Sequence, residues 1–241
     1  MVINKYLAEL VGTFILVLFG SMAILGAGEI GTLILTVPFG FGLGLLAAIY
    51  AVGHVSGGHF NPAVTLAMFL DKRTSGIDLV GYWVSQFAGG LLASLVLLVV
   101  VNRDAVANTT TSYPLLEMGI MSELILTTVF CLVILASTRT APATAGIAIS
   151  LTLVAVHFVG IPFSGASVNP ARSFAPAVVG GNLTGLWVYL IFPLVGGVVA
   201  WGLWQLFQPG ATQIEVDLGS DDSSVETEEA ELPEPGAETD S

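Results

Sequence analysis

Six long apolar stretches constrain this chain more than any other feature of its sequence. A helix needs about 20 apolar residues to cross a hydrocarbon core about 30 Å thick. Six stretches of the 241 residues are long enough, and they cover residues 6–27, 33–54, 79–101, 115–137, 144–162 and 186–207. With 54% hydrophobic and only 10% charged residues, the chain has too much apolar surface for a soluble enzyme of this size. The sequence therefore predicts an all-α membrane protein.

The first apolar stretch is expected to stay in the protein rather than to be a cleaved signal peptide. It carries Glu9, reaches full spanning length and is echoed later in the chain. The loops predict its direction. With the N-terminus inside, Lys5, Lys72, Arg73 and Arg139 fall on cytoplasmic segments, and one base, Arg103, falls in an outer loop. The positive-inside rule then predicts a multi-pass protein of the cell membrane with both termini in the cytoplasm.

Acidic residues are concentrated at the C-terminal end. Residues 211–241 contain eleven Asp and Glu and no base, whereas residues 1–210 contain six basic and seven acidic residues. A segment with so much charge cannot bury enough apolar surface to fold. We expect residues 209–241 to be a disordered cytoplasmic tail. It is either a solvated segment or one that regulates the protein or binds a partner.

The apolar body contains two copies of one pattern. Ser-Gly-Gly-His-Phe-Asn-Pro-Ala at residues 56–63 returns 108 residues later as Ser-Gly-Ala-Ser-Val-Asn-Pro-Ala at residues 164–171. Upstream, the residues around Glu9 are echoed by those around Glu123. Each copy has three spans, and because three is odd, the second copy enters the membrane upside down. We therefore expect an inverted repeat, residues 1–110 and 111–208, with its functional site at the midplane between the halves.

The Asn-Pro-Ala segments predict two short helices. Asn is a favoured N-cap, and Pro is favoured at the first helical position. The apolar continuations, Ala63–Leu70 and Ala171–Val179, are each about 15 Å long, so neither can span alone. Two of them end to end match the thickness of the core, with their N-termini meeting at its centre.

The doubled Asn-Pro-Ala motif carries a resemblance to a known family. Over about residues 4–207 the chain resembles the aquaporins, the major intrinsic protein channels. The resemblance implies six tilted helices, two re-entrant half-helices that form a seventh pseudo-span, and four such pores in a homotetramer. It implies water as the permeant, no cofactor, no metal and no nucleic acid.

The centre of the implied pore is made by the two motifs: Asn61, Pro62, Ala63, Asn169, Pro170 and Ala171. The asparagines offer amide donors, and each caps a helix whose N-terminus behaves like about +0.5 of a charge. A water that accepts from both amides turns its hydrogens outward, which breaks a proton relay. The glycine-rich approaches are expected to expose carbonyls along the pore: Gly57, Gly58, His59, Phe60, Gly165, Ala166, Ser167 and Val168.

Arg172 is the only base expected deep in the outer half of the membrane. An arginine at that depth is costly, so a functional role is favoured over structural pairing with a buried carboxylate. The resemblance places it in a narrow filter with Phe41, twenty residues before Asn61, and His157, twelve before Asn169. Ala166 takes the fourth filter position.

The remaining polar residues of the spans are expected to be structural. The resemblance favours hydrogen bonds from the re-entrant segments to Glu9 and Glu123 over a proton relay. For His54 and His59, bracing of the inner segment is favoured over pH gating. Cys131 is expected to be inert in mid-span.

The filter residues favour a passive water-selective channel. Ser173 and Ala177 also match the water channels, whereas Leu190 departs from their usual aromatic pair. The alternative is a glycerol or small neutral solute facilitator of the same family. An ion-coupled transporter shares the inverted repeat but would need a coupling site beyond the two glutamates. An intramembrane enzyme would need a nucleophile or metal cluster, for which the sequence has no suitable ligand spacing.

Overall fold

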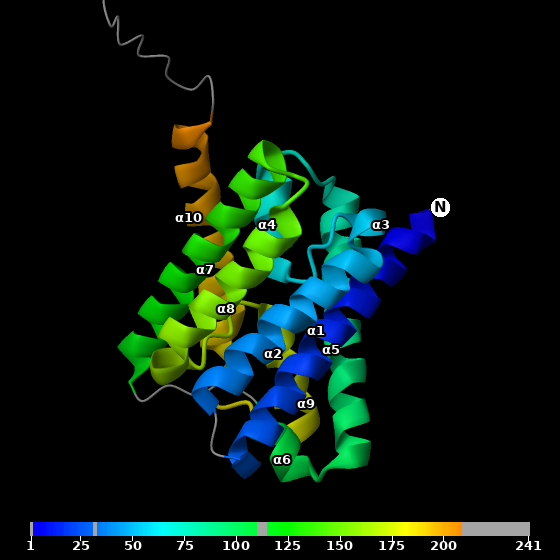
Figure 1. Cartoon of the computed structure of the whole chain (residues 1–241), viewed down its shortest axis with the longest axis vertical. Coiled ribbons are helices and arrows are strands. Elements are labelled where there is room, and N and C mark those ends of the chain that lie inside the picture. Colours follow the sequence, from blue (N-terminus) through cyan, green and yellow to red (C-terminus); the bar gives the residue numbers. More distant parts are fainter. Residues whose placement is uncertain (1, 31–32, 110–114, 209–241) are drawn as a thin grey trace, which may run out of the picture.

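The computed structural model describes residues 2–30, 33–109 and 115–208, which form helices joined by short loops (Figure 1). In chain order these are α1 (Val2–Ile30), α2 (Leu33–Ala48), a π-helical turn (Ile49–Gly53), α3 (His54–Ser56), α4 (Pro62–Leu70), α5 (Gly76–Val100), α6 (Arg103–Ala107), α7 (Leu116–Thr140), α8 (Ala145–Ser164), α9 (Pro170–Gly180) and α10 (Leu186–Phe207). No strand occurs in the described residues, and the all-helical fold class is confirmed. The predicted tail, residues 209–241, lies outside the described residues.

Six segments of the described chain are long and apolar enough to cross a membrane. They are α1, α2 with its continuation to Ser56, α5, α7, α8 and α10. Each begins and ends within a few residues of a predicted stretch. Large apolar side chains such as Phe19, Leu43 and Val99 point outward and are exposed. Such an apolar outer surface is suited to lipid rather than to water.

Two loops differ from the sequence prediction. The sequence predicts that the first span ends at residue 27, before a glycine-rich stretch, but α1 continues to Ile30. One glycine in a helix costs about 1 kcal/mol, and in lipid an unpaired backbone costs more, so the helix continues. The polar stretch after α5, also predicted to be a loop, contains the short helix α6. Asn102 caps α6, since its side chain accepts a hydrogen bond from the Ala105 amide at 2.8 Å.

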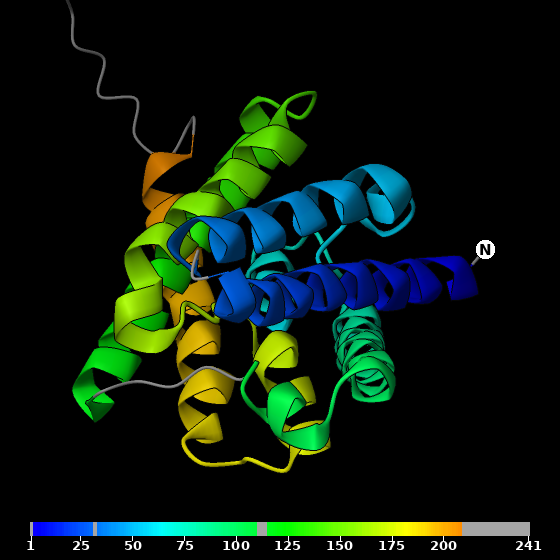
Figure 2. The same ribbon diagram turned by 60° about the horizontal axis from the view of Figure 1, so that its bottom comes forward.

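The two halves of the chain interlock. Within each half, α1 packs on α2 and α5, and α7 packs on α8 and α10. Each short helix packs on a long helix of the other half, because α4 contacts α10 and α9 contacts α5. Figure 1 shows α4 near one end of the bundle and α9 near the other, and Figure 2 shows the bundle turned toward the α9 end. The half-helices therefore enter from opposite ends, as an inverted repeat requires.

Paired glycines allow this close approach. A Cβ at Gly90 would meet the Ala171 carbonyl of α9, and one at Gly197 would meet the Ala63 carbonyl of α4. Gly90 and Gly197, the second glycine of the pair in each half, thus each accommodate the first turn of the half-helix that belongs to the other half. Small residues commonly allow helix backbones to approach within membranes.

Candidate functional site

The two half-helices meet at their N-termini. Asn61 and Asn169 have extended backbones, and each side-chain oxygen accepts a hydrogen bond from the amide two residues later, at 2.9 and 3.0 Å. Each side-chain nitrogen donates across to the other segment: Asn61 Nδ2 to the Val168 carbonyl at 2.7 Å, and Asn169 Nδ2 to the Phe60 carbonyl at 2.9 Å. These bonds use one N–H of each amide, so each asparagine has a second N–H for another acceptor.

Two buried carboxylates hold the segments that lead to the asparagines. Glu9 accepts hydrogen bonds from the Ser56 hydroxyl, the His59 and Phe60 amides and the Gln86 side chain, at 2.6–2.9 Å.

Glu123 accepts from the Ser164 hydroxyl and from the Ser167 and Val168 amides, at 2.7–2.8 Å. Both carboxyl groups are fully buried. Phe60 and Val168 have positive φ angles of 50° and 46°, a strained conformation that these hydrogen bonds stabilise.

A narrow cavity of about 10 Å³, close to the space that one water molecule occupies, lies beside the paired asparagines. Corresponding residues of the two repeats line it in pairs. Leu16 and Phe130 correspond when counted from Glu9 and Glu123. Leu45 with Leu153, His59 with Ser167, and Asn61 with Asn169 correspond when counted from the Asn-Pro-Ala motifs. Val168, Phe41, His157 and Arg172 complete the lining. The cavity therefore follows the symmetry of the repeat at its centre and departs from it toward Phe41.

Three of the four predicted filter residues come together on this cavity. The Phe41 and His157 rings stack, with centroids 4.5 Å apart and 20° between their planes. The guanidinium carbon of Arg172 lies 4.6 Å from the centre of the Phe41 ring, a cation–π contact. Ala166 is also buried, but it does not line the cavity, and its Cβ lies against Gly160 of α8.

The polar atoms of this cluster are only partly satisfied by protein. His157 Nδ1 lies 2.9 Å from the Leu153 carbonyl, so this nitrogen carries the proton and Nε2 of the neutral ring is an acceptor. A nitrogen of Arg172 donates to the Thr109 carbonyl at 3.4 Å. Within the described chain, His157 Nε2 and Arg172 Nε are buried without a hydrogen-bond partner. Buried polar atoms of this kind are normally satisfied by water.

Comparison with known proteins identifies the family to which this architecture belongs. The sequence profile of the family described as "Major intrinsic protein" matches residues 1–204. The chain belongs to the major intrinsic protein family. It is a multi-pass membrane protein with the fold and transport function of a channel of that family, which confirms the family resemblance.

Similar curated proteins include both water-channel and facilitator names. The chain is 38% identical over 224 residues to Aquaporin Z of Photorhabdus laumondii subsp. laumondii, covering 85% of this chain and 97% of the relative. It is 37% identical over 208 residues to Glycerol uptake facilitator protein-like 6 of Lactiplantibacillus plantarum, covering 82% and 94%. An X-ray structure of the aquaglyceroporin from Plasmodium falciparum superposes with a TM-score of 0.75 at 21% identity, over 85% of this chain and 96% of that one. At that identity the match supports the fold alone.

Several residues that fix the site of this major intrinsic protein were not predicted from its sequence. Gln86 donates to Glu9 and, at 2.8 Å, to the Thr65 hydroxyl, which lies 3.1 Å from His59 Nδ1. An isolated glutamine in an apolar span could have been recognised, because polar side chains there are costly.

Two tyrosines have a structural role that the sequence did not predict. The Tyr82 hydroxyl donates to the Ser56 carbonyl at 2.7 Å, and the Tyr189 hydroxyl donates to the Ser164 carbonyl at 2.9 Å. Both tyrosines follow their asparagine by about twenty residues, so the repeat itself carried this signal. They fix the ends of the helices from which the re-entrant segments start.

The other residues that were predicted to be structural differ in their burial and in their distance from the cavity. His54 is exposed, whereas His59 is buried and lines the cavity. Cys131 is buried on α7, one residue after the cavity-lining Phe130.

Proposed function

We propose that this member of the major intrinsic protein family conducts water passively in single file and excludes ions and protons. The observation that carries the proposal is the cluster of Phe41, His157 and Arg172 on the cavity. The two residues that carry the unpartnered acceptor and donor, His157 and Arg172, line this narrow space together with the apolar ring of Phe41. Such a lining replaces the hydrogen bonds of one small polar molecule and leaves little room for a larger one.

The paired asparagines support the exclusion of protons. The second N–H of each amide is proposed to donate to a passing water, which turns that water's hydrogens away from the centre. The two helix N-termini each add about +0.5 of a charge at the same place, which repels cations including hydronium.

Backbone carbonyls of the two re-entrant segments are proposed to accept hydrogen bonds from water along the rest of the path. Phe60 and Val168 already accept one bond each from the asparagines, and a carbonyl oxygen has two lone pairs. Ala166 is proposed to act through its carbonyl rather than its methyl group, because its Cβ is turned toward Gly160.

A glycerol facilitator is the second candidate. The 37% identity to a protein named as facilitator-like and the leucine at position 190 favour it. Ser173 and the aromatic–histidine pair favour the water channel.

The proposed assembly is a homotetramer with both termini in the cytoplasm and with α4 in the cytoplasmic half. The four bases at positions 5, 72, 73 and 139 support this orientation. Residues 1–110 and 111–208 are the proposed repeats.

Flux measurements on proteoliposomes test the proposal. We expect stopped-flow shrinkage in sucrose to be much faster than in protein-free vesicles, and recovery in glycerol to be unchanged by the protein. Rapid glycerol entry would establish the facilitator instead. A matched variant, Asn61→Ala together with Asn169→Ala, is expected to reduce water flux at equal protein content.

A further inference from the structure

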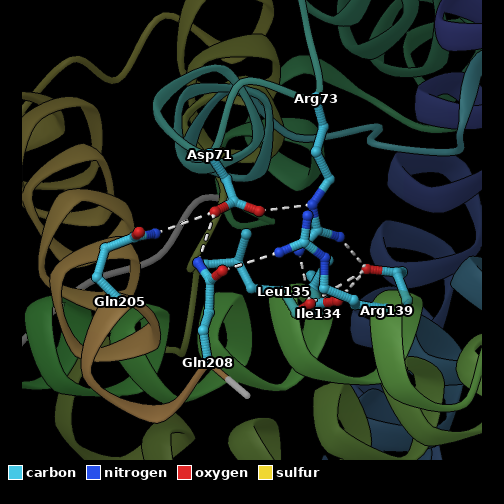
Figure 3. Close-up of polar contacts among 8 residues, drawn as sticks. Asp71, Arg73, Ile134, Leu135, Arg139, Gln205 and Gln208 are labelled. Carbon is cyan, nitrogen blue, oxygen red and sulfur yellow. Dashed lines mark hydrogen bonds and ion pairs between the residues drawn. The ribbon is translucent and has the colours of Figure 1, made fainter. Parts of the chain in front are cut away.

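A cluster of polar side chains joins three helix ends on the α4 side of the bundle (Figure 3). It connects the end of α4, the last turns of α7 and the end of α10. We call this set the clasp, and it consists of Asp71, Arg73, Thr138, Arg139, Gln205 and Gln208. None of these residues belongs to the repeated pattern of residues 56–63 and 164–171 that carries the family resemblance.

Asp71, the residue that ends α4, is the centre of the clasp. Its Oδ2 accepts from Arg73 Nε at 2.6 Å, and its Oδ1 accepts from Gln205 Nε2 at 3.0 Å and from Gln208 Nε2 at 3.4 Å. The Asp71 side chain is only 4% exposed. A shielded carboxylate with several donors is held more firmly than an ion pair in open solvent.

Arg73 carries the connection on to α7. Two of its nitrogens donate to the Thr138 hydroxyl at 2.7 Å and to the Leu135 carbonyl at 2.8 Å. A cation near the C-terminus of a helix is also favoured by the helix dipole. Arg139 completes the ring, since it donates to Gln208 Oε1 at 2.9 Å.

The clasp fixes the end of α4 that is remote from the asparagines. The N-terminal end is held by the Asn61 bond to Val168 and by Trp83, whose Nε1 donates to the Pro62 carbonyl at 3.0 Å. Between the two ends α4 has nine residues, and its side chains Val64 and Met68 belong to the apolar core. Apolar contacts have no strong directional preference, so they do not by themselves set the position of so short a helix along its axis.

We propose that Asp71 is a positioning residue for conduction: through the clasp it holds α4 at the depth and tilt that keep Asn61 at the cavity. This proposal rests on the proposed channel function. In this proposal Asp71 does not contact the permeant. Asp71 acts by holding the half-helix α4 in place. The last turn of α10 is the anchor, because both glutamines that bind Asp71 Oδ1 lie there.

The experiment compares Asp71→Ala with a matched control, Asp78→Ala. Asp78 forms an ion pair with Lys5 at 2.7 Å, and neither residue belongs to the clasp. Full-length proteins are reconstituted, and flux per folded channel is measured for whichever solute the wild type conducts. We expect Asp71→Ala to reduce that flux about fivefold, Asp71→Glu to restore at least half of it, and Asp78→Ala to leave it unchanged.

Hydrogen–deuterium exchange separates positioning from general loss of stability and does not depend on which solute permeates. In Asp71→Ala we expect faster exchange in residues 66–73, with residues 7–20 of α1 unchanged. Should Asp71→Ala not fold, the double variant Gln205→Ala and Gln208→Ala removes the α10 arm alone and is expected to show the same local effect. Wild-type flux with unchanged exchange, or an equal loss in Asp78→Ala, would overturn the proposal. A wild type that conducts neither water nor glycerol refutes the channel function while the exchange result still decides on the clasp.

Discussion

The two half-helices, α4 and α9, are alike where they meet and differ in most of the side chains that follow. Both begin with Asn-Pro-Ala, both asparagines bond across to the other segment, and both approaches are held by a buried glutamate. Three residues after the asparagine, however, α4 has Val64 and α9 has Arg172.

The same contrast holds for the other filter residues. The position twenty residues before the asparagine is Phe41 in the first repeat and Ile149 in the second. The position twelve before it is Ile49 in the first and His157 in the second. The second set, Val64, Ile149 and Ile49, belongs to or packs against the apolar core. The scaffold is therefore duplicated, whereas the proposed selectivity comes from three replacements on the α9 side.

The largest expected effect comes from breaking what the halves share. Glu9→Ala leaves four donors without this acceptor, and Glu123→Ala leaves three. Each unsatisfied buried donor lowers the free energy of unfolding by about 1–3 kcal/mol. This approaches the whole stability of a typical domain. We expect little monodisperse protein in size-exclusion chromatography.

Replacing each glutamate by glutamine tests whether the number of donors determines the stabilisation. Because Glu9 accepts from four groups and Glu123 from three, Glu9→Gln should lower the thermal unfolding temperature more than Glu123→Gln. If both variants lower the unfolding temperature equally, the stabilisation by each glutamate does not depend on the number of donors that it accepts from.

Next in size is the effect of making α9 resemble α4. Arg172→Val removes the charge that the resemblance places in the filter, and we expect permeability to small neutral solutes or cations to rise about tenfold, equivalent to about 1.4 kcal/mol in the barrier. Solute-resolved flux in proteoliposomes measures this. Wild-type permeability to every tested solute would show that Arg172 has no part in selection.

Widening the same region should have a smaller effect. Phe41→Ala combined with His157→Ala removes the stacked rings, and we expect several-fold faster glycerol entry with water flux retained. Stopped-flow recovery in glycerol is the measurement. The matched control is Ile149→Ala with Ile49→Ala, which changes the corresponding positions of the other half and should leave glycerol excluded.

The smallest effect concerns the ends of the half-helices. Just beyond α4, Lys72 has a φ of 60°, whereas Gly181 ends α9 with a φ of 80°. A side chain in this left-handed region costs about 1 kcal/mol, so Lys72→Gly should raise the unfolding temperature by about 2–4 °C. Gly181→Ala should lower it by a similar amount. Thermal unfolding in detergent tests both changes.

Much of the fold could be predicted because lipid allows few solutions. Hydropathy located the six spans, and the repeated asparagine-proline pair located both half-helices. The continuation of α1 beyond residue 27 to Ile30 was missed because glycine breaks helices in water more readily than in lipid. The family resemblance predicted that Phe41, His157 and Arg172 lie together. It did not predict that the Ala166 side chain points away from the cavity, because this depends on backbone angles that a motif does not encode.

The clasp could not be predicted from one sequence. Asp71 and Gln205 are 134 positions apart, and each taken alone is an ordinary polar residue at a helix end. The role of Gln86 could be predicted in part. A glutamine in an apolar span is unusual, but its position in the sequence does not indicate its hydrogen-bond partners.

The reciprocal bonds between the asparagines and the opposite segments also have a consequence for biosynthesis. Asn61 finds its acceptor at Val168, which the ribosome adds 107 residues later. During synthesis the Asn61 side chain at the start of the first half-helix therefore lacks this acceptor. No conducting path can form before the second half-helix has been made. A membrane that must stay sealed during translation benefits from a pore that is completed only after the second Asn-Pro-Ala segment has been made.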